Sequence, residues 1–237
     1  MIAPSTMHPI IERARSEGRA VLTEVEAGEL LGQAGISLVP TRLALSCVDT
    51  VAASLELGFP VALKIASLDI IHKSDAGGIR LGLENAGQVE TVYLALIEEA
   101  GRRFPAARLQ GVYVQPMAPP GTEVIIGMKK DAQFGPVLMF GLGGVWVEVL
   151  QDFSLRVTPI TRRDAAEMVR EIKGYPLLTG YRGREPVDTG CLEEMLLAVG
   201  RLAQEYPAIS EIDLNPVIAG ASGAVAVDAR VVLEKFP

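Results

Sequence analysis

A lysine in an apolar strand, followed by a polar loop, has the residue types needed to hold and transfer phosphate. Lys64 lies inside the apolar run 61–66, and the loop beyond it carries His72 and the glycine pair Gly77 and Gly78. The lysine would supply a fixed positive charge, the glycines would let backbone N–H groups approach an anion, and a phosphoryl group could reach the histidine. The alternative is a strand with an exposed lysine and an ordinary loop, because glycine pairs are common in turns.

The two strands predicted at the end of the chain carry a second group of chemically competent side chains. A hairpin centred on the turn 220–223 would place Asn215 opposite Asp228. In the same register Asp213 shares their face and lies opposite Arg230. An amide oxygen beside a carboxylate suits Mg²⁺, which proteins hold through one or two oxygens while phosphate and water complete the octahedron. The alternative for Asn215 and Asp228 is a polar, solvent-facing hairpin, and the alternative for Asp213 is a structural salt bridge. A one-residue bulge would break the predicted register.

A segment typical of a hinge separates these two groups. The strand 111–115 ends at a proline, and 117–121 contains three further turn-forming residues. The hinge backbone from Gln115 to Met117 would meet the edge of an adenine ring. Glu123, just beyond the hinge, would then accept a hydrogen bond from a ribose hydroxyl, and the alternative for Glu123 is a plain exposed strand residue.

The elements around the hinge predict an α+β fold with two lobes and a cleft between them. Strands and helices alternate before the hinge, whereas four strand-like runs follow it in quick succession, as in a mostly antiparallel sheet. Two helices are expected after this sheet, opened by Thr161 and Asp188. Three domains are predicted. Residues 1–21 form an N-terminal arm or helix, residues 22–115 form a small lobe with the phosphate loop, and residues 116–237 form a large lobe with the metal-binding hairpin.

Three further features leave their alternatives open. The glycine-rich run 140–144 could approach a ligand closely or simply join two strands. Glu148 lies on an otherwise apolar strand, where an unpaired charge would be costly to bury, so it could face the cleft. Arg182, on the glycine-flanked loop 180–183, could clamp an anion or be solvated.

The composition argues against several classes of function. Of the 237 residues, 49% are hydrophobic and 22% charged, as in a well-packed globular protein, and the net charge of −7 argues against nucleic-acid binding. No apolar run approaches the roughly 18 residues that span a bilayer, and the N-terminus lacks the apolar core of a signal peptide, so we expect a cytoplasmic protein without membrane contact. Cys47 and Cys191 lie far apart without a metal-binding motif, and we expect both to be buried small hydrophobic residues.

The order and spacing of these motifs resemble those of one known family. The motifs are Lys64, 72–78, 115–117, Glu123, 140–144, 180–183, 211–216 and 227–230. Each is weak by itself, but the set is specific and covers about 22–233. In this set the chain resembles the ATP-grasp β subunit of ADP-forming acyl-CoA (acetyl-CoA) synthetases, within a superfamily that includes the β chain of succinyl-CoA synthetase.

The resemblance implies an ATP-grasp fold and half of a ligase. Such a subunit would bind ATP or ADP with Mg²⁺ and would need a CoA-binding α subunit that carries a second phosphohistidine, in an α2β2 assembly. Together they would convert acid, CoA and ATP reversibly into acyl-CoA, ADP and phosphate. On the family's pattern Lys64 contacts the nucleotide phosphates, the hinge reads adenine and Glu123 takes the ribose, while Asn215 with Asp228 holds Mg²⁺.

His72 would have the most distinctive role. The resemblance implies that it carries a phosphoryl group between two distant sites on a mobile loop, and an imidazole that is neutral at pH 7 is a competent nucleophile for this step. A static phosphate ligand is the alternative. Two rival functions keep the fold: a carboxylate–amine ligase, which needs neither an α partner nor a carrier histidine, and a nucleotide-binding module of a protein acetyltransferase or regulatory subunit.

Overall fold

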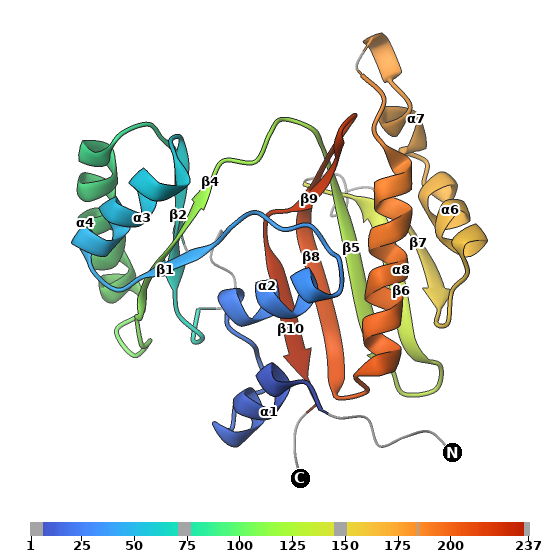
Figure 1. Cartoon of the computed structure of the whole chain (residues 1–237), viewed down its shortest axis with the longest axis horizontal. Helices are drawn as coiled ribbons and strands as arrows, with labels where there is room; N and C mark the ends of the chain where they lie inside the picture. Colours follow the sequence, from blue (N-terminus) through green and yellow to red (C-terminus); the bar gives the residue numbers. More distant parts are fainter. Residues whose placement is uncertain (1–6, 71–76, 145–150, 184, 235–237) are drawn as a thin grey trace. The chain divides into compact units, whose positions relative to one another are not determined.

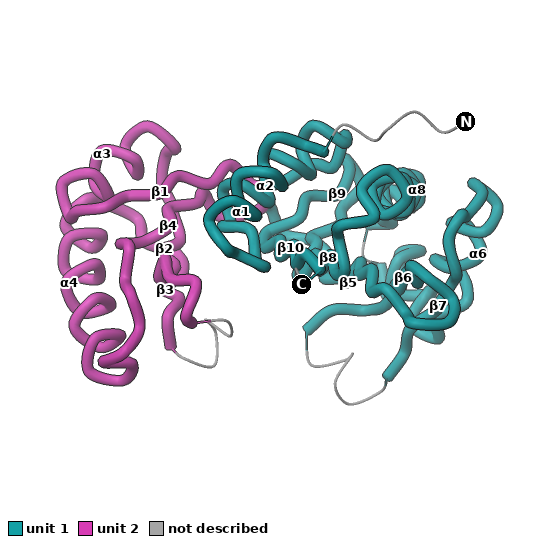
Figure 2. The backbone as a smooth tube through the Cα atoms, turned by 90° about the horizontal axis from the view of Figure 1, so that it is seen from below, with its two compact units in different colours: residues 1–38, 119–237 teal, residues 39–118 magenta. Residues whose placement is uncertain are grey.

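The computed structural model describes residues 7–70, 77–144, 151–183 and 185–234 and groups the chain into two units. Unit 1 comprises residues 1–38 and 119–237, and unit 2 comprises residues 39–118 (Figure 2). Each unit has its own sheet and its own hydrophobic core.

Unit 2 is a four-stranded antiparallel sheet with two helices on one face (Figure 1). The spatial order of the strands is β1, β4, β2, β3. The elements are β1 Arg42–Ala44, α3 Cys47–Leu57, β2 Val61–Ala66, β3 Ile79–Leu83, α4 Ala86–Arg103 and β4 Gly111–Pro116. Leu63 and Ile65 of β2 belong to the same core as Leu96 of α4. Because side chains alternate along a strand, Lys64 points to the opposite face of the sheet.

Unit 1 is a six-stranded antiparallel sheet, and α1, α2, α6 and α8 lie on one side of it (Figure 2). The strand order is β10, β8, β5, β6, β7, with β9 paired to β8. The elements are α1 Pro9–Ser16, α2 Glu24–Gln33, β5 Thr122–Asp131, β6 Gly135–Leu142, β7 Phe153–Val157, α6 Arg162–Glu171, α7 Tyr175–Leu178, the 3₁₀ helix η1 Tyr181–Gly183, α8 Thr189–Glu205, β8 Ile209–Gly220, β9 Gly223–Ala226 and β10 Ala229–Leu233. Val124 and Leu214 pack in the core with Leu196 of α8. Glu123 and Asn215, one residue away along each strand, are exposed on the other face.

The two predicted helix starts are confirmed. Asp164 donates its N–H to Thr161 Oγ1 at 3.2 Å at the start of α6, and Gly190 donates its N–H to Asp188 Oδ1 at 3.0 Å at the start of α8. These side-chain oxygens satisfy N–H groups that have no partner within the helix. Among the described helices, none combines the length and the apolar character needed to cross a membrane.

The boundary between the units differs from the predicted domains at the N-terminal side. Residues 22–38, predicted as part of the small lobe, belong to unit 1, because Leu30 and Leu31 of α2 are buried in its core. Leu22 also donates its N–H to the carbonyl of Val231 at 3.1 Å. On the other side unit 2 ends at residue 118, inside the segment 117–121 predicted as a hinge.

The predicted register of the C-terminal hairpin is confirmed. Arg230 pairs with Asp213, and Asn215 donates its backbone N–H to the carbonyl of Asp228 at 3.2 Å. The irregularity in the pairing of β10 with β8 lies at the far end of β10, beyond these residues. Asn215 and Asp228 therefore face each other.

Asp152, between β6 and β7, is a buried carboxylate with a structural role. It is 6% exposed, and its two oxygens accept hydrogen bonds from the backbone N–H groups of Lys173 and Gly174, both at 2.7 Å. These bonds tie the turn after α6 to the sheet.

We expect Asp152→Ala to lower the free energy of unfolding by about 2–4 kcal/mol, because two buried N–H groups lose their acceptor. Asp131 offers a matched control, since its Oδ1 also accepts two backbone N–H groups, from Gln133 and Phe134, but at an exposed position. Asp131→Ala should cost about 1 kcal/mol or less, because water can replace the carboxylate. Urea unfolding measures both values, and equal losses would contradict the role given to burial.

Candidate functional site

Lys64 is a buried charge on the face of the unit 2 sheet that points away from the helices. It is 3% exposed and lies between Tyr113 of β4 and Ile79 of β3. The alternative of an exposed lysine is therefore wrong. The attraction of the Lys64 ammonium to an anion is stronger in a medium of low dielectric constant. The position suits an ammonium that contacts phosphate.

The loop after β2 returns to the sheet beside Lys64. Gly77 has a φ of +67°, in the left-handed region that favours glycine, and its carbonyl accepts a hydrogen bond from Arg80 Nη1 at 2.6 Å. The carbonyl of Gly78 accepts from the N–H of Ile65 at 2.8 Å. The glycine pair is thus fixed next to the lysine, as the sequence pattern requires.

Two residues singled out from the sequence lie outside the described residues. His72 falls in 71–76 and Glu148 falls in 145–150. Ile70, which is 5% exposed, and Gly77 are the described neighbours on either side of the histidine segment. Of these neighbours, Ile70 belongs to the core of unit 2, and Gly77 precedes Gly78, whose carbonyl is hydrogen-bonded to β2.

The predicted hinge residues lie at the end of β4, next to β2. Gln115 pairs with Ala62, is 2% exposed, and donates from Nε2 to Thr41 Oγ1 at 2.7 Å. Since Ala62 and Lys64 are two residues apart, Gln115 shares the face of Lys64. Met117 donates its N–H to the carbonyl of residue 60 at 3.0 Å, which keeps the chain in line with β2 beyond the end of the strand.

In unit 1, negative charge gathers where Asn215 and Asp228 face each other. Burial, followed by the carboxylates of Glu211 and Asp228, raises the pKa of the nearby Asp213, while Arg230 acts in the opposite sense. The predicted salt bridge to Arg230 comes from Glu211 rather than from Asp213, with Nη1 3.1 Å from Oε1. An acidic group whose ionisation is opposed by its acidic neighbours marks a position where a cation is favoured.

The donor set at this face fits Mg²⁺. It consists of an amide oxygen of Asn215, which is exposed, and the carboxylate of Asp228, whose Oδ1 also accepts the N–H of Ala229 at 2.9 Å. Within the described ranges, no group of three or more His, Cys, Asp or Glu side chains is arranged to hold a metal. Two protein oxygens with phosphate and water as the remaining ligands match the habit of Mg²⁺ better than that of a metal enclosed by protein.

Glu123, at the start of β5, lies against the glycine-rich run 140–144. Residues 140–142 complete β6, and Gly143 then donates its N–H to the carbonyl of Glu123 at 2.8 Å. The first three residues of the run therefore belong to β6, and the predicted strand that follows the run lies at 145–150, outside the described residues. The contact of this run with Glu123 is not predicted from the sequence, in which the paired glycines are the available signal.

The structure brings the predicted residues together in two groups, one in each unit. In unit 2 they lie on neighbouring strands or directly beside the ends of these strands, and they are Lys64, Gly77, Gly78, Gln115 and Met117. In unit 1 Glu123 and Asn215 lie on the neighbouring strands β5 and β8, and Asp228 lies just before β10.

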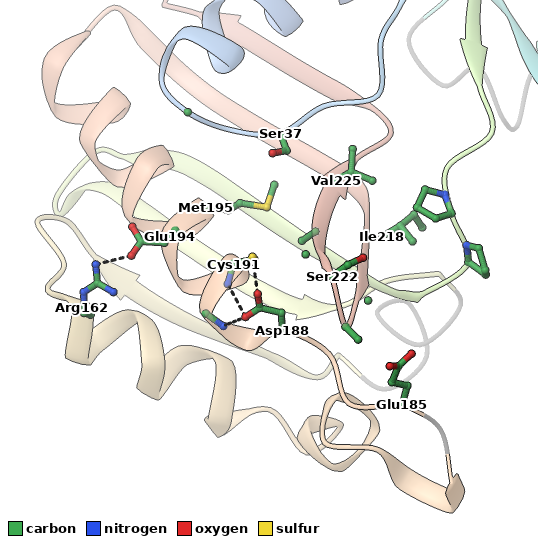
Figure 3. Close-up of a pocket in the computed structure, with 18 residues that line it drawn as sticks. Ser37, Arg162, Glu185, Asp188, Cys191, Glu194, Met195, Ile218, Ser222 and Val225 are labelled. Atoms are coloured by element: carbon green, nitrogen blue, oxygen red, sulfur yellow. Dashed lines mark hydrogen bonds and ion pairs between the residues drawn. The ribbon is translucent and has the colours of Figure 1, made fainter. Parts of the chain in front are cut away.

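A hollow of about 1010 Å³ lies elsewhere in unit 1, between the start of α8 and the β8–β9 turn (Figure 3). Cys191 lines it and donates from Sγ to Asp188 Oδ2 at 3.0 Å. This hydrogen bond and burial raise the pKa of the Cys191 thiol, so the thiol stays protonated and is a poor nucleophile. Cys47 and Cys191 are both half-buried, and the expectation that they are buried hydrophobic residues is wrong. The described lining includes no residue predicted to contact nucleotide or metal.

Arg182 is held in an unusual backbone conformation. Its φ of 55° and ψ of 39° are left-handed, which is uncommon for a residue with a Cβ, and its guanidinium lies 5.4 Å from the centroid of the Tyr181 ring. The side chain is exposed. The structure thus orients the arginine along its own 3₁₀ turn and leaves the choice between anion clamp and solvated side chain open.

The two α+β units with their antiparallel sheets are those of the ATP-grasp class. A family model described as an ATP-grasp domain matches residues 13–233. The β subunit of acetate–CoA ligase (ADP-forming) I from Pyrococcus furiosus is 47% identical over 224 residues, which cover 94% of this chain and 96% of that protein. The chain therefore belongs to the family of β subunits of ADP-forming acetate–CoA ligases, as the sequence resemblance predicted.

One relative places the same domain in a longer chain. The ADP-forming acetate–CoA ligase I of Archaeoglobus fulgidus is 43% identical over 224 residues, which cover 94% of this chain and 32% of that protein. The present chain thus spans about a third of that relative's length.

Solved structures agree with the family assignment. One of them is the dinucleotide forming acetyl-coenzyme A synthetase 1 of Ca. Korarchaeum cryptofilum, in complex with coenzyme A, Ca-AMPCP and HgCl⁺. It matches with a TM-score of 0.92 and 46% identity over 94% of this chain and 98% of that one. A second structure of that enzyme matches with a TM-score of 0.84 and 43% identity over 95% of this chain and 98% of that one. It is a complex with coenzyme A and Mg-AMPPCP, and its phosphohistidine segment points towards the nucleotide binding site.

Proposed function

We propose that this chain is the nucleotide-binding subunit of an ADP-forming acyl-CoA synthetase, which converts an acid, CoA and ATP reversibly into acyl-CoA, ADP and phosphate. The observation that carries the proposal is the opposed pair Asn215 and Asp228, an oxygen pair suited to a hard cation on the same sheet face as Glu123. It occurs in a chain that belongs to this ligase family.

Each predicted residue has a role in this proposal. Lys64 and the glycine pair contact the nucleotide phosphates, the backbone of 115–117 contacts adenine, and Glu123 accepts from a ribose hydroxyl. Asn215 and Asp228 hold Mg²⁺, which when bound supplies positive charge beside the phosphate oxygens. The burial of Lys64 and the negative charge around Asp228 support these assignments.

His72 is the phosphoryl carrier in this proposal. One of its imidazole nitrogens attacks the γ-phosphorus of ATP, so that an N–P bond forms while the P–O bond to ADP breaks. The phosphoryl group then passes, by way of the partner's phosphohistidine, to a carboxylate oxygen of the acid, and the CoA thiol displaces phosphate from the resulting acyl phosphate to give acyl-CoA. The Korarchaeum enzyme with its phosphohistidine segment directed at the nucleotide supports this role by similarity.

The partner in this proposal is a CoA-binding α subunit with a second phosphohistidine, in an α2β2 assembly. The naming of the Pyrococcus relative as a β subunit supports a separate partner chain. The longer Archaeoglobus relative supports it as well, because about two thirds of that protein lies outside the matched region.

The test is reconstitution with a CoA-binding α chain. We expect the chain alone to bind ATP and ADP with a dependence on Mg²⁺, and to form ATP from acetyl-CoA, ADP and phosphate only when the α chain is added. Turnover of ATP with an amine and a carboxylic acid, without any partner, would show the carboxylate–amine ligase instead. Nucleotide binding without turnover in the presence of the α chain would show a regulatory module.

A further inference from the structure

The end of β6 lies against Glu123 at the start of β5. The pairing of β5 with β6 runs to Val124 opposite Leu142, and the bond from Gly143 N–H to the Glu123 carbonyl at 2.8 Å extends it by one residue. The chain at Gly143 therefore runs directly alongside Glu123.

A side chain on Gly143 would be crowded by Glu123. A Cβ placed on it would lie 3.0 Å from Glu123 Cβ and 3.1 Å and 3.2 Å from the carbonyl carbon and oxygen of the same residue. These distances are shorter than ordinary van der Waals contact, and two of the three atoms are backbone, which cannot swing away as a flexible side chain does. An alanine at position 143 would therefore require Glu123 or Gly143 to move by a few tenths of an ångström.

Gly144 borders the carboxylate itself. A Cβ on Gly144 would lie 3.1 Å from Glu123 Oε2, and its φ of +63° is in the left-handed region that favours glycine. Two successive glycines thus touch one glutamate at different places, Gly143 at its backbone and Cβ and Gly144 at its charged end.

We propose that Gly143 and Gly144 form a specificity element that leaves the Glu123 carboxylate in position for recognition of a ribose hydroxyl, because a side chain at either glycine would displace it. This inference rests on the proposed role of Glu123 as the ribose contact. A carboxylate held in one place accepts a hydrogen bond from a hydroxyl, and a site built for that bond rejects an analogue that lacks the hydroxyl. A carboxylate that is free to move rejects it much less. The glycine pair therefore sets how strongly the site prefers ribonucleotides to deoxyribonucleotides.

The test is the ratio of the dissociation constants of deoxy-ATP and ATP, measured by calorimetry with 2′-deoxy-ATP and 3′-deoxy-ATP on the full chain. For the unaltered chain we expect at least one deoxynucleotide to bind about tenfold to a hundredfold more weakly than ATP. Gly143→Ala and Gly144→Ala should each reduce that ratio to about threefold or less. A change in the ratio is not expected from a general loss of stability, which affects all three nucleotides alike.

Gly135 is the matched control, because its φ of +75° is also left-handed and a Cβ there meets nothing within 4 Å. Gly135→Ala should keep the ratio of the unaltered chain. Glu123→Ala removes the acceptor itself and so tests the ribose contact separately from the glycines. If Glu123→Ala keeps the full ratio, or the unaltered chain shows none, the ribose role of Glu123 is wrong. If Glu123→Ala loses the ratio while both glycine variants keep it, the glycine inference is wrong and the ribose role stands.

If Gly143→Ala fails to fold, Gly144→Ala decides the question, since it meets only the end of the side chain. Thermal unfolding of each variant identifies that case.

Discussion

Asp228→Ala is expected to raise the Mg²⁺ concentration needed for half-maximal ATP synthesis by at least a factor of about 100, in the reconstituted enzyme with the α chain. The proposed site offers Mg²⁺ one charged oxygen donor, from Asp228, and one neutral donor, from Asn215. Removal of the charged donor leaves a single amide oxygen, which is too little to compete with water for this ion. Titration of the initial rate with MgCl₂ at saturating ADP and acetyl-CoA measures the shift.

Glu211→Gln is the control for Asp228→Ala. Glu211 lies on β8, the strand that carries Asn215, and pairs with Arg230 at 3.1 Å, so its replacement also removes one negative charge from this face. Because its carboxylate is already engaged, we expect the Mg²⁺ requirement to change by about threefold or less. Equal shifts in the two variants would mean that the face attracts Mg²⁺ by its total charge and that Asp228 is not a ligand.

The register of this hairpin could be predicted from the sequence because it depends on local rules. A short turn fixes which residues oppose each other, and the side-chain period of two then decides the face. Both rules apply between residues close in the sequence, such as Asn215 and Asp228. The helix starts at Thr161 and Asp188 could be predicted for the same reason, since a cap involves only the next three residues.

Other features depend on partners that the sequence does not indicate. Residues 22–38 belong to unit 1 because Leu30 and Leu31 of α2 share a core with strands near the far end of the chain. The contact of Gly143 with Glu123 depends on the pairing of β5 with β6, which the sequence suggested only as neighbouring strands. The burial of Lys64 likewise follows from its position between β3 and β4 and not from its own strand.

His72→Ala is expected to reduce overall turnover by at least a factor of about 10³ while changing the affinity for ATP by about threefold or less. In the proposed reaction the histidine forms a bond to phosphorus in every cycle, so its loss removes a step rather than a contact. Nucleotide binding depends on other residues, chiefly Lys64 and the hinge.

Lys64→Met is the matched variant, because it keeps an unbranched side chain at a buried position but removes the charge. We expect it to weaken ATP binding about tenfold to a hundredfold, the value of a charge-assisted hydrogen bond to phosphate. After incubation with γ-labelled ATP, the unaltered chain should carry an acid-labile phosphoryl group, and His72→Ala should not. Calorimetry gives the nucleotide affinity of both variants.

The contrast between these two variants distinguishes a carrier from a static ligand. If His72→Ala weakened ATP binding as much as Lys64→Met does, the histidine would be one more phosphate contact and the carrier role would be wrong. If labelling persisted in His72→Ala, another residue would accept the phosphoryl group. The carrier role therefore requires all three results together: affinity retained, label lost and turnover lost.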